Sequence, residues 1–137
     1  MKVLKFGGTS VGNAKNIKKV VEIITNINEQ KIIVLSAISG TTNSLLDIYK
    51  RIKENQQPEA LEVISNLEVN YLLLVNQLFT TKIYQQKAID FVTENFYTRR
   101  KLTQKTANLI VENRTVAQWE IITTKWVQLY CGDTQIS

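Results

Sequence analysis

The chain has 137 residues, of which 44% are hydrophobic and 21% are charged, and its net charge is +5 with a pI near 9.4. This composition is typical of a soluble globular protein, and the length allows one domain at most, with a sizeable core. The sequence contains no histidine and a single cysteine, Cys131. It therefore excludes histidine-based catalysis, an intrachain disulfide and the usual cysteine or histidine metal sites.

The positive charges are scattered along the chain, which gives little support to a nucleic-acid partner. The densest group, residues 99–101, is short and lies in a helical pattern, so we interpret it as a solvated helix face. The first residues enter a strand pattern without the apolar core of a signal peptide. No window is long and apolar enough to span a bilayer. We expect a cytoplasmic protein that binds neither nucleic acid nor membrane.

The front of the chain predicts a strand, a helix and a second strand. Residues 2–6 form a short apolar strand pattern, and residues 13–27 place apolar side chains at the spacing of one buried helical stripe. The run Ile32–Leu35 is continuously apolar, as expected of a strand that is covered on both faces. This strand–helix–strand unit predicts two parallel strands joined by a right-handed crossover.

Two loops rich in glycine and hydroxyl groups follow these strands. Residues 5–12 read Lys-Phe-Gly-Gly-Thr-Ser-Val-Gly, and residues 36–43 read Ser-Ala-Ile-Ser-Gly-Thr-Thr-Asn. Glycines let the backbone approach an anion, and the first amides of the following helix point at it. Open α/β sheets bind ligands outside the carboxyl ends of their strands, so both loops are predicted to face one cleft. The order of lysine and glycines excludes a P-loop, in which the lysine comes last.

Beyond residue 42 the pattern is almost wholly helical. One stripe covers residues 45–52, Pro58 suits the first turn of a helix whose stripe ends at Leu78, and residues 80–81 can cap a third helix. That third helix has Ile89, Val92, Phe96, Leu102, Leu109 and Ile110 on its stripe. The last helix has Val116, Trp119, Ile122, Trp126 and Tyr130. We interpret all these stripes as core. Because sheets usually have roughly four to six strands, two strands indicate part of a larger domain.

These motifs resemble those of aspartate kinases, within the wider amino-acid kinase family. Residues 5–12 match the opening signature of that family at eight consecutive positions, and residues 35–43 resemble its serine-alanine and threonine-asparagine motif. Residues 120–124 resemble its glycine-glutamate motif, although Trp119 stands where the family has the glycine. The resemblance extends over nearly the whole chain.

The resemblance implies an α/β fold, the three-layer α/β/α sandwich of amino-acid kinases, here incomplete. Its parallel βαβ start would be followed by a helix-rich second half. Residues 1–137 would be the amino-terminal part of the kinase domain, which carries the phosphate loop and the aspartate site. The nucleotide-binding half and the regulatory ACT domains of the family would be absent.

The implied activity is ATP-dependent phosphorylation of the L-aspartate side-chain carboxylate to aspartyl-4-phosphate. This is the first step of lysine, threonine and methionine biosynthesis, with ATP and Mg²⁺ required and L-aspartate as substrate. A carboxylate is already ionised at neutral pH and needs no general base, so the lack of histidine is no obstacle. Full-length members of the family are expected to be homo-oligomers.

The resemblance also assigns a phosphate-binding segment. Lys5 would be the catalytic residue that stabilises the transferring phosphoryl group, surrounded by backbone amides of the glycine-rich loop. As alternatives, Lys5 could keep an edge strand soluble, and the paired glycines could simply form a tight turn. The residues assigned to ATP and phosphate are Lys5, Phe6, Gly7, Gly8, Thr9 and Ser10.

The aspartate site is assigned in the same way. Ser36 and Thr42 would hold aspartate, and Glu120 would pair with its ammonium group, while no metal ligand is assigned. Ser36 could instead form a strand-end turn and Thr42 a helix N-cap, and Glu120 could be an ordinary surface residue. Ser39 and Thr41 are weaker candidates for substrate contact.

Three functional hypotheses remain open at this stage. The chain could be the amino-terminal part of an aspartate kinase, or a truncated and catalytically inactive remnant of one. A small basic helical module that binds nucleic acid is the remote alternative, and it would show binding that falls steeply with added salt.

Overall fold

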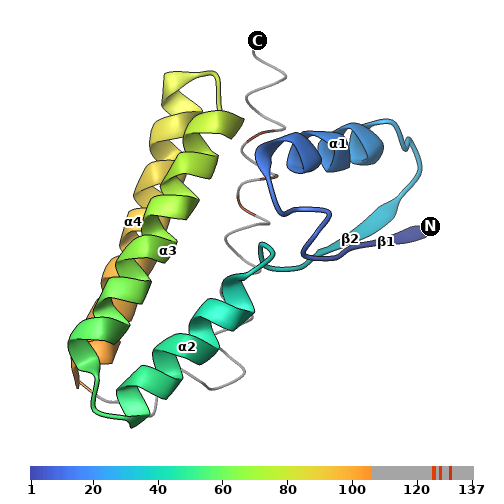
Figure 1. Cartoon of the computed structure of the whole chain (residues 1–137). Coiled ribbons are helices and arrows are strands. Elements are labelled where there is room, and N and C mark those ends of the chain that lie inside the picture. Colours follow the sequence, from blue (N-terminus) through green and yellow to red (C-terminus); the bar gives the residue numbers. More distant parts are fainter. Residues whose placement is uncertain (106–124, 126, 128–129, 131–137) are drawn as a thin grey trace.

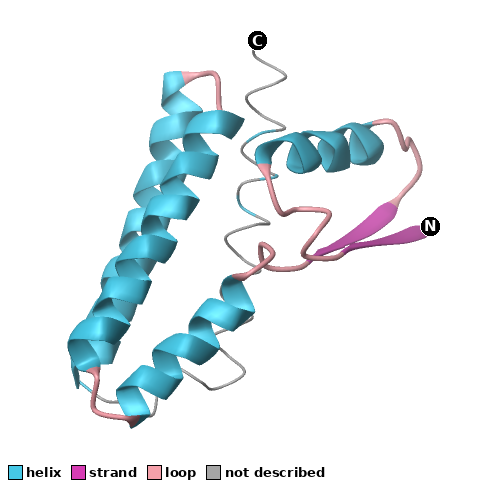
Figure 2. Cartoon of the chain, in the orientation of Figure 1, coloured by secondary structure: helices cyan, strands magenta, loops and turns pink. Residues whose placement is uncertain are grey.

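The computed structural model describes residues 1–105, 125, 127 and 130 of the chain. The elements, in chain order, are β1 (Lys2–Phe6), α1 (Ala14–Thr25), β2 (Lys31–Leu35), α2 (Thr41–Lys53), α3 (Gln57–Leu78) and α4 (Lys82–Lys105). Figure 1 shows α1 over the two strands on one side and the long helices α3 and α4 packed together on the other, with α2 running below them. Figure 2 shows that helix dominates the described part of the chain.

The βαβ unit forms as predicted. β1 and β2 are parallel, with Lys2 opposite Lys31 and Phe6 opposite Leu35. Helix α1 begins where the apolar stripe begins, because the side chain of Asn13 accepts a hydrogen bond from the Asn16 amide at 2.8 Å. The helix ends at Thr25, so the last predicted member of its stripe, Ile27, lies in the turn that follows.

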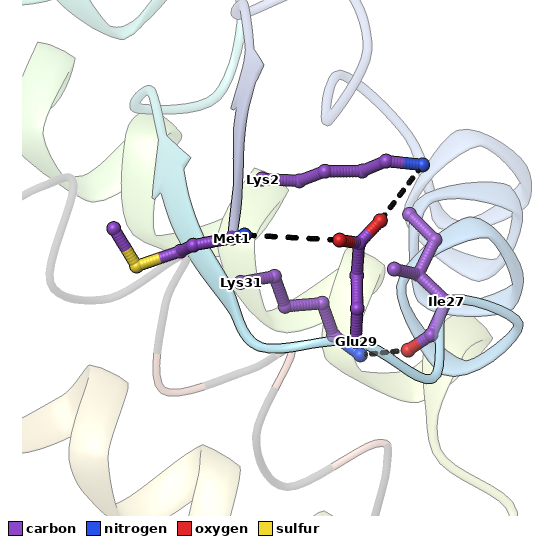
Figure 3. Close-up of polar contacts among 5 residues, drawn as sticks. All are labelled: Met1, Lys2, Ile27, Glu29 and Lys31. Carbon is purple, nitrogen blue, oxygen red and sulfur yellow. Dashed lines mark hydrogen bonds and ion pairs between the residues drawn. The ribbon is translucent and has the colours of Figure 1, made fainter.

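An electrostatic clamp joins the start of β1 to the turn before β2. Glu29 lies 3.0 Å from the Lys2 ammonium group and 3.8 Å from the amino group of Met1, and Lys31 donates a hydrogen bond to the carbonyl of Ile27 (Figure 3). These side chains are largely exposed, so the clamp contributes little free energy of unfolding. In the observed register Lys2 lies opposite Lys31, and Glu29 supplies a negative charge beside Lys2.

The sheet is covered on one face only. Leu35 is 6% exposed, and Phe6 and Ile33 pack with it against the core that includes α1. On the opposite face Ile32 and Val34 remain 48% and 44% exposed. The prediction that β2 is covered on both faces is therefore wrong. A continuous apolar run indicates that both faces of a strand could be buried. Burial of both faces also requires an element packed against each of them.

The long helices supply most of the remaining core. Pro58 lies in the first turn of α3, as predicted, and α4 begins directly after Thr81. Tyr71 of α3 and Phe96 of α4 meet edge to face, with ring centroids 5.7 Å apart. The predicted stripe of α4 is confirmed at its first three positions, where Val92 and Phe96 are buried and Ile89 is half-buried.

The basic group at residues 99–101 does not form a simple solvated face. Arg100 is half-buried, forms an ion pair with Glu68 of α3, and donates a hydrogen bond to the Ser65 hydroxyl at 3.3 Å. The Glu68 carboxylate is largely covered by the helix pair, and such a group requires a nearby positive charge. The prediction is therefore wrong for Arg100, while the side chains of its two neighbours lie outside the described residues.

The end of the chain is described at three positions, all of them helical: Lys125, Val127 and Tyr130. Val127 is buried, and the Tyr130 ring lies 6.4 Å from that of Phe79. The predictions for residues 106–124, which include the glutamate motif, fall outside the described residues. In the part of the chain that is described, no helix combines the length and apolarity needed to cross a membrane.

Candidate functional site

The first glycine-rich loop joins β1 to α1 through two consecutive turns. The Ser10 amide donates to the Gly7 carbonyl at 3.0 Å, and the Gly12 amide donates to the Thr9 carbonyl at 3.3 Å. The side-chain amide of Asn16, in the first turn of α1, also donates to the Thr9 carbonyl, at 3.0 Å. The loop is thus tied to the helix that follows it, as an anion-binding strand–loop–helix requires.

Three glycines of this loop play different roles. A Cβ at Gly8 would lie 3.2 Å from the Ala37 carbonyl oxygen, and one at Gly12 would lie 3.2 Å from the Gly8 carbonyl oxygen. Glycine suits both positions, because a Cβ there would crowd a neighbouring backbone carbonyl. A Cβ at Gly7 would meet no atom within 4 Å. The open space beside Gly7 is therefore available to a ligand, whereas the other two glycines serve the packing of the loops.

The second loop touches the first directly. The Ser36 amide donates to the Phe6 carbonyl at 3.0 Å, and the Ser39 amide donates to the Gly8 carbonyl at 3.3 Å. The two loops therefore lie together at the carboxyl ends of the parallel strands, as predicted. They form one connected surface and do not face one another across an open cleft.

A cavity lies on each side of this connected surface. One of about 420 Å³ is bounded by Phe6, Thr9 and Ser10 of the first loop together with the exposed side of α1. The other, of about 270 Å³, is bounded by residues of the second loop and by Asn70 and Tyr71 of α3. Three residues predicted to bind phosphate therefore line one cavity.

Lys5 lies on the open face of the sheet, paired in register with Val34. Its side chain is exposed, and no described residue forms an ion pair with it. Its ammonium group is therefore available to an external anion. The alternative role, as an edge-strand lysine that keeps the sheet soluble, is also compatible with this position.

The residues predicted to bind aspartate are placed as follows. Ser36 is half-buried directly after β2, and Thr42 is exposed in the first turn of α2. Thr42 is not an N-cap, because the helix already begins at Thr41 and Gly40 takes the cap position with φ at +89°. Ser39 is exposed beside Gly8, while Glu120, with Trp119, lies outside the described residues.

One polar contact of the site was missed from the sequence. The Thr41 hydroxyl lies 2.6 Å from that of Tyr71, and Thr41 is 1% exposed. Tyr71 was interpreted only as a core residue of its helical stripe. Burial raises the pKa of Tyr71 above its ordinary value, with a smaller opposing effect from the hydrogen bond. No spacing pattern in the sequence reveals a contact between residues 30 positions apart.

The described residues contain no group of three acidic, histidine or cysteine side chains that could hold a metal ion. The polar groups near the loops are hydroxyls, amides and the ammonium groups of Lys5 and Lys19. Such groups suit anions such as phosphate and carboxylate. They do not form a set of ligands for Mg²⁺, and we assign none.

Comparison with known proteins agrees with this fold. The sequence profile of the amino acid kinase family matches residues 1–120. The chain therefore belongs to the amino acid kinase family.

Similar sequences are aspartate kinases. Aspartate kinase Ask_LysC of Stutzerimonas stutzeri is 32% identical over 117 residues, which cover 79% of this chain and 28% of that protein. The aspartokinase of Rickettsia conorii is 33% identical over 132 residues, which cover 93% of this chain and 31% of that protein. The chain thus spans less than a third of the length of these relatives.

The same fold occurs in solved aspartokinases. E. coli aspartokinase III in complex with aspartate and ADP matches with a TM-score of 0.70 at 20% identity, covering 98% of this chain and 29% of the other. Its complex with lysine and aspartate matches with a TM-score of 0.69 at 19% identity. The predicted amino-acid kinase fold, with a parallel βαβ start and a helix-rich second half, is confirmed.

Proposed function

We propose that this chain is the part of an aspartate kinase that receives L-aspartate and the phosphoryl group transferred from ATP. The observation that carries the proposal is the hydrogen bond from the Ser39 amide to the Gly8 carbonyl. It joins residues 5–12, proposed to bind phosphate (the phosphate loop), to residues 36–43, proposed to bind aspartate (the aspartate loop). The sequence relatives, all named as aspartate kinases or aspartokinases, support it. So does the structural neighbour, which is in complex with aspartate and ADP.

The proposed reaction is an in-line phosphoryl transfer. A side-chain carboxylate oxygen of aspartate attacks the γ-phosphorus of ATP, a new O–P bond forms, and the bond to the β,γ-bridging oxygen breaks to release ADP. The nucleophile is already ionised, so no base has to remove a proton. The main barrier is the approach of two anions, which the Lys5 charge and the loop amides beside Gly7 would lower.

Each predicted site residue has a role in this proposal. Phe6, Gly8, Thr9 and Ser10 shape the phosphate loop, and Ser36 and Thr42 contact aspartate through their hydroxyl groups. Glu120 pairs with the aspartate ammonium group. Mg²⁺ would neutralise charge on the ATP phosphates, and the described residues supply no ligands for it.

The proposal also concerns the larger protein. Residues 1–137 would be the amino-terminal part of the kinase domain, and the nucleotide half would correspond to the part of the relatives that this chain does not match. We place the protein in the cytoplasm, at the first step of lysine, threonine and methionine biosynthesis. Full-length relatives are expected to be homo-oligomers.

Two measurements on the chain test the proposal. In isothermal titration calorimetry, the wild type should bind L-aspartate and Thr42→Ala should not. D-Aspartate and succinate should bind the wild type only weakly. Wild-type protein that takes up no L-aspartate would overturn the assignment.

Turnover distinguishes an active enzyme from an inactive remnant. We expect no aspartate- and Mg²⁺-dependent ADP release above background, with hydroxylamine present to trap aspartyl phosphate as the hydroxamate. The reason is that the chain spans less than a third of its relatives. Robust release of ADP would instead show that the chain is a kinase by itself.

A further inference from the structure

The aspartate loop ends in a buried polar contact that the proposed reaction does not use. Among the residues that the structure describes, Thr41 is a polar residue that is almost fully buried. Its hydroxyl lies 2.6 Å from the hydroxyl of Tyr71. Either oxygen can be the donor of this bond. Thr41 directly follows Gly40, whose left-handed backbone turns the loop into α2.

Tyr71 gives this contact a rigid base. It lies in the middle of α3, is 2% exposed, and packs edge to face against Phe96 of α4. The bond therefore connects the loop to the helix pair α3–α4.

The loop is held at its other points within the βαβ unit. Ser36 is bonded to Phe6, and Ser39 is bonded to Gly8, in both cases through backbone groups. The side-chain hydrogen bond between Thr41 and Tyr71 reaches from this loop to α3. It thus restrains the position of the loop relative to the long helices.

Packing leaves space beside this contact, although Ile38 of the loop is buried in the core. The cavity of about 270 Å³ lies directly beside the contact and is lined by Ser39, Gly40, Thr41, Asn70 and Tyr71. A loop with empty space on one side can shift into it when a directional contact is removed. The hydrogen bond therefore restrains a movement that the neighbouring side chains would permit.

We propose that the hydroxyl pair Thr41–Tyr71 is a positioning contact that holds the loop bearing Ser36 and Thr42 in the conformation that binds L-aspartate. This inference rests on the proposed function. Thr42 adjoins Thr41 in the first turn of α2, so the orientation of its side chain follows that of the residue anchored to Tyr71. Neither member of the pair is assigned a contact with substrate.

The test uses the whole chain, four single variants and the double variant Thr41→Val with Tyr71→Phe. Thr41→Val and Tyr71→Phe each remove one hydroxyl with little change of volume, and Thr41→Ser keeps the hydroxyl and removes a methyl group. Ile64→Val, also buried in α3, serves as a control that lowers stability without touching the pair. Amide hydrogen exchange at Ser39 and the Kd for L-aspartate are measured for each.

We expect Thr41→Val and Tyr71→Phe to raise the Kd for L-aspartate about fivefold, as loss of one hydrogen bond would. Exchange at Ser39 should become faster by a similar factor. The double variant should bind no more weakly than either single variant, because both remove the same bond. Thr41→Ser should restore wild-type affinity, and Ile64→Val should leave the affinity unchanged.

Failure of this inference is distinguishable from failure of the proposed function. If the wild type binds L-aspartate and both hydroxyl variants bind it equally tightly, the positioning role is overturned and the function stands. If Ile64→Val weakens binding as much as they do, the effect is one of general stability and the inference is wrong. If the wild type binds no L-aspartate, the proposed function itself fails, and the inference falls with it.

Discussion

At the scale of single residues, the adjacent glycines 7 and 8 differ in their surroundings. Backbone atoms crowd Gly8, whereas the space beside Gly7 is open. Replacement of Gly8 by Ala would place a methyl group 3.2 Å from the Ala37 carbonyl oxygen, whereas the same change at Gly7 would meet nothing within 4 Å. We expect Gly8→Ala to lower the free energy of unfolding by about 1–3 kcal/mol, the usual cost of overpacking. Gly7→Ala should change it by less than about 0.5 kcal/mol.

Urea unfolding of the two variants measures this difference. Gly7→Ala is the matched control, since it makes the same chemical change one position earlier. Equal stability of the two variants would contradict the close approach of the two loops at Gly8.

Tyr71 predicts a specific dependence of stability on pH. Burial raises its pKa in the folded protein above the ordinary value of 10.0, so the unfolded chain loses the phenolic proton first as the pH rises. The contribution of Tyr71 is therefore fully present below pH 10.0 and is lost progressively above it. The slope reaches at most about 1.4 kcal/mol per pH unit.

The measurement compares chemical unfolding between pH 8 and 11.5 in the wild type and in Tyr71→Phe. The loss of stability with rising pH should be less steep in Tyr71→Phe, because the variant lacks the phenolic proton whose pKa burial raises. Identical slopes in the wild type and Tyr71→Phe would overturn the prediction.

At the scale of elements, one ion pair joins α3 to α4. Arg100 lies against the largely covered Glu68 carboxylate and also bonds to Ser65. Arg100→Met would leave that carboxylate without its partner, and we expect a loss of about 1–3 kcal/mol, reduced from the fully buried case because solvent reaches part of the arginine. Glu68→Gln together with Arg100→Met should lose less than the sum of the two single changes.

A thermal double-mutant cycle measures this coupling. Arg51 and Asp47 offer the comparison, since they form an i,i+4 pair on the surface of α2 at 3.0 Å. Disruption of that exposed pair should cost less than about 0.5 kcal/mol. Strict additivity at Arg100 and Glu68 would show that the two side chains do not interact.

At the scale of the whole molecule, the sheet leaves an apolar face to solvent. Val3 is 65% exposed, and Ile32 and Val34 lie beside it on the same face. Exposed apolar surface promotes association of a protein at high concentration. We expect the double change Ile32→Thr and Val34→Thr to reduce concentration-dependent light scattering while leaving the free energy of unfolding within about 1 kcal/mol of the wild type.

Leu35→Ala is the control on the covered face. This residue is 6% exposed, so its truncation should cost about 2–4 kcal/mol without reducing association. Equal scattering of the wild type and the threonine variant would show that the open face does not drive association.

The sequence predicted the parts of the fold that depend on neighbours along the chain. The helical spacing of apolar residues in 13–27 predicted α1, although the helix ends two residues earlier, and the crossover rule predicted the parallel strands. Glycine spacing located both loops of the site. The prediction that β2 is buried on both faces was wrong, because an apolar run does not show whether another element packs against each face.

Contacts between distant residues could not be predicted in the same way. Thr41 and Tyr71 are 30 positions apart, and Arg100 and Ser65 are 35 apart. The helical periodicity of the sequence explains the position of each side chain in its own helix. It does not predict which residue of another helix that side chain contacts. The N-cap of α2 was missed for a local reason, since the left-handed Gly40 displaced the hydroxyl residue expected there.

The hydrogen bond between Ser39 and Gly8 has a thermodynamic consequence for the two ligands. If the proposed function is correct, a phosphate group that draws the Gly8 backbone toward it would move the loop proposed to bind aspartate, and aspartate would act on the first loop through the same bond. Linkage requires the two effects to be equal, so each ligand would change the affinity of the other by one common factor. The two substrates would then bind as a cooperative pair.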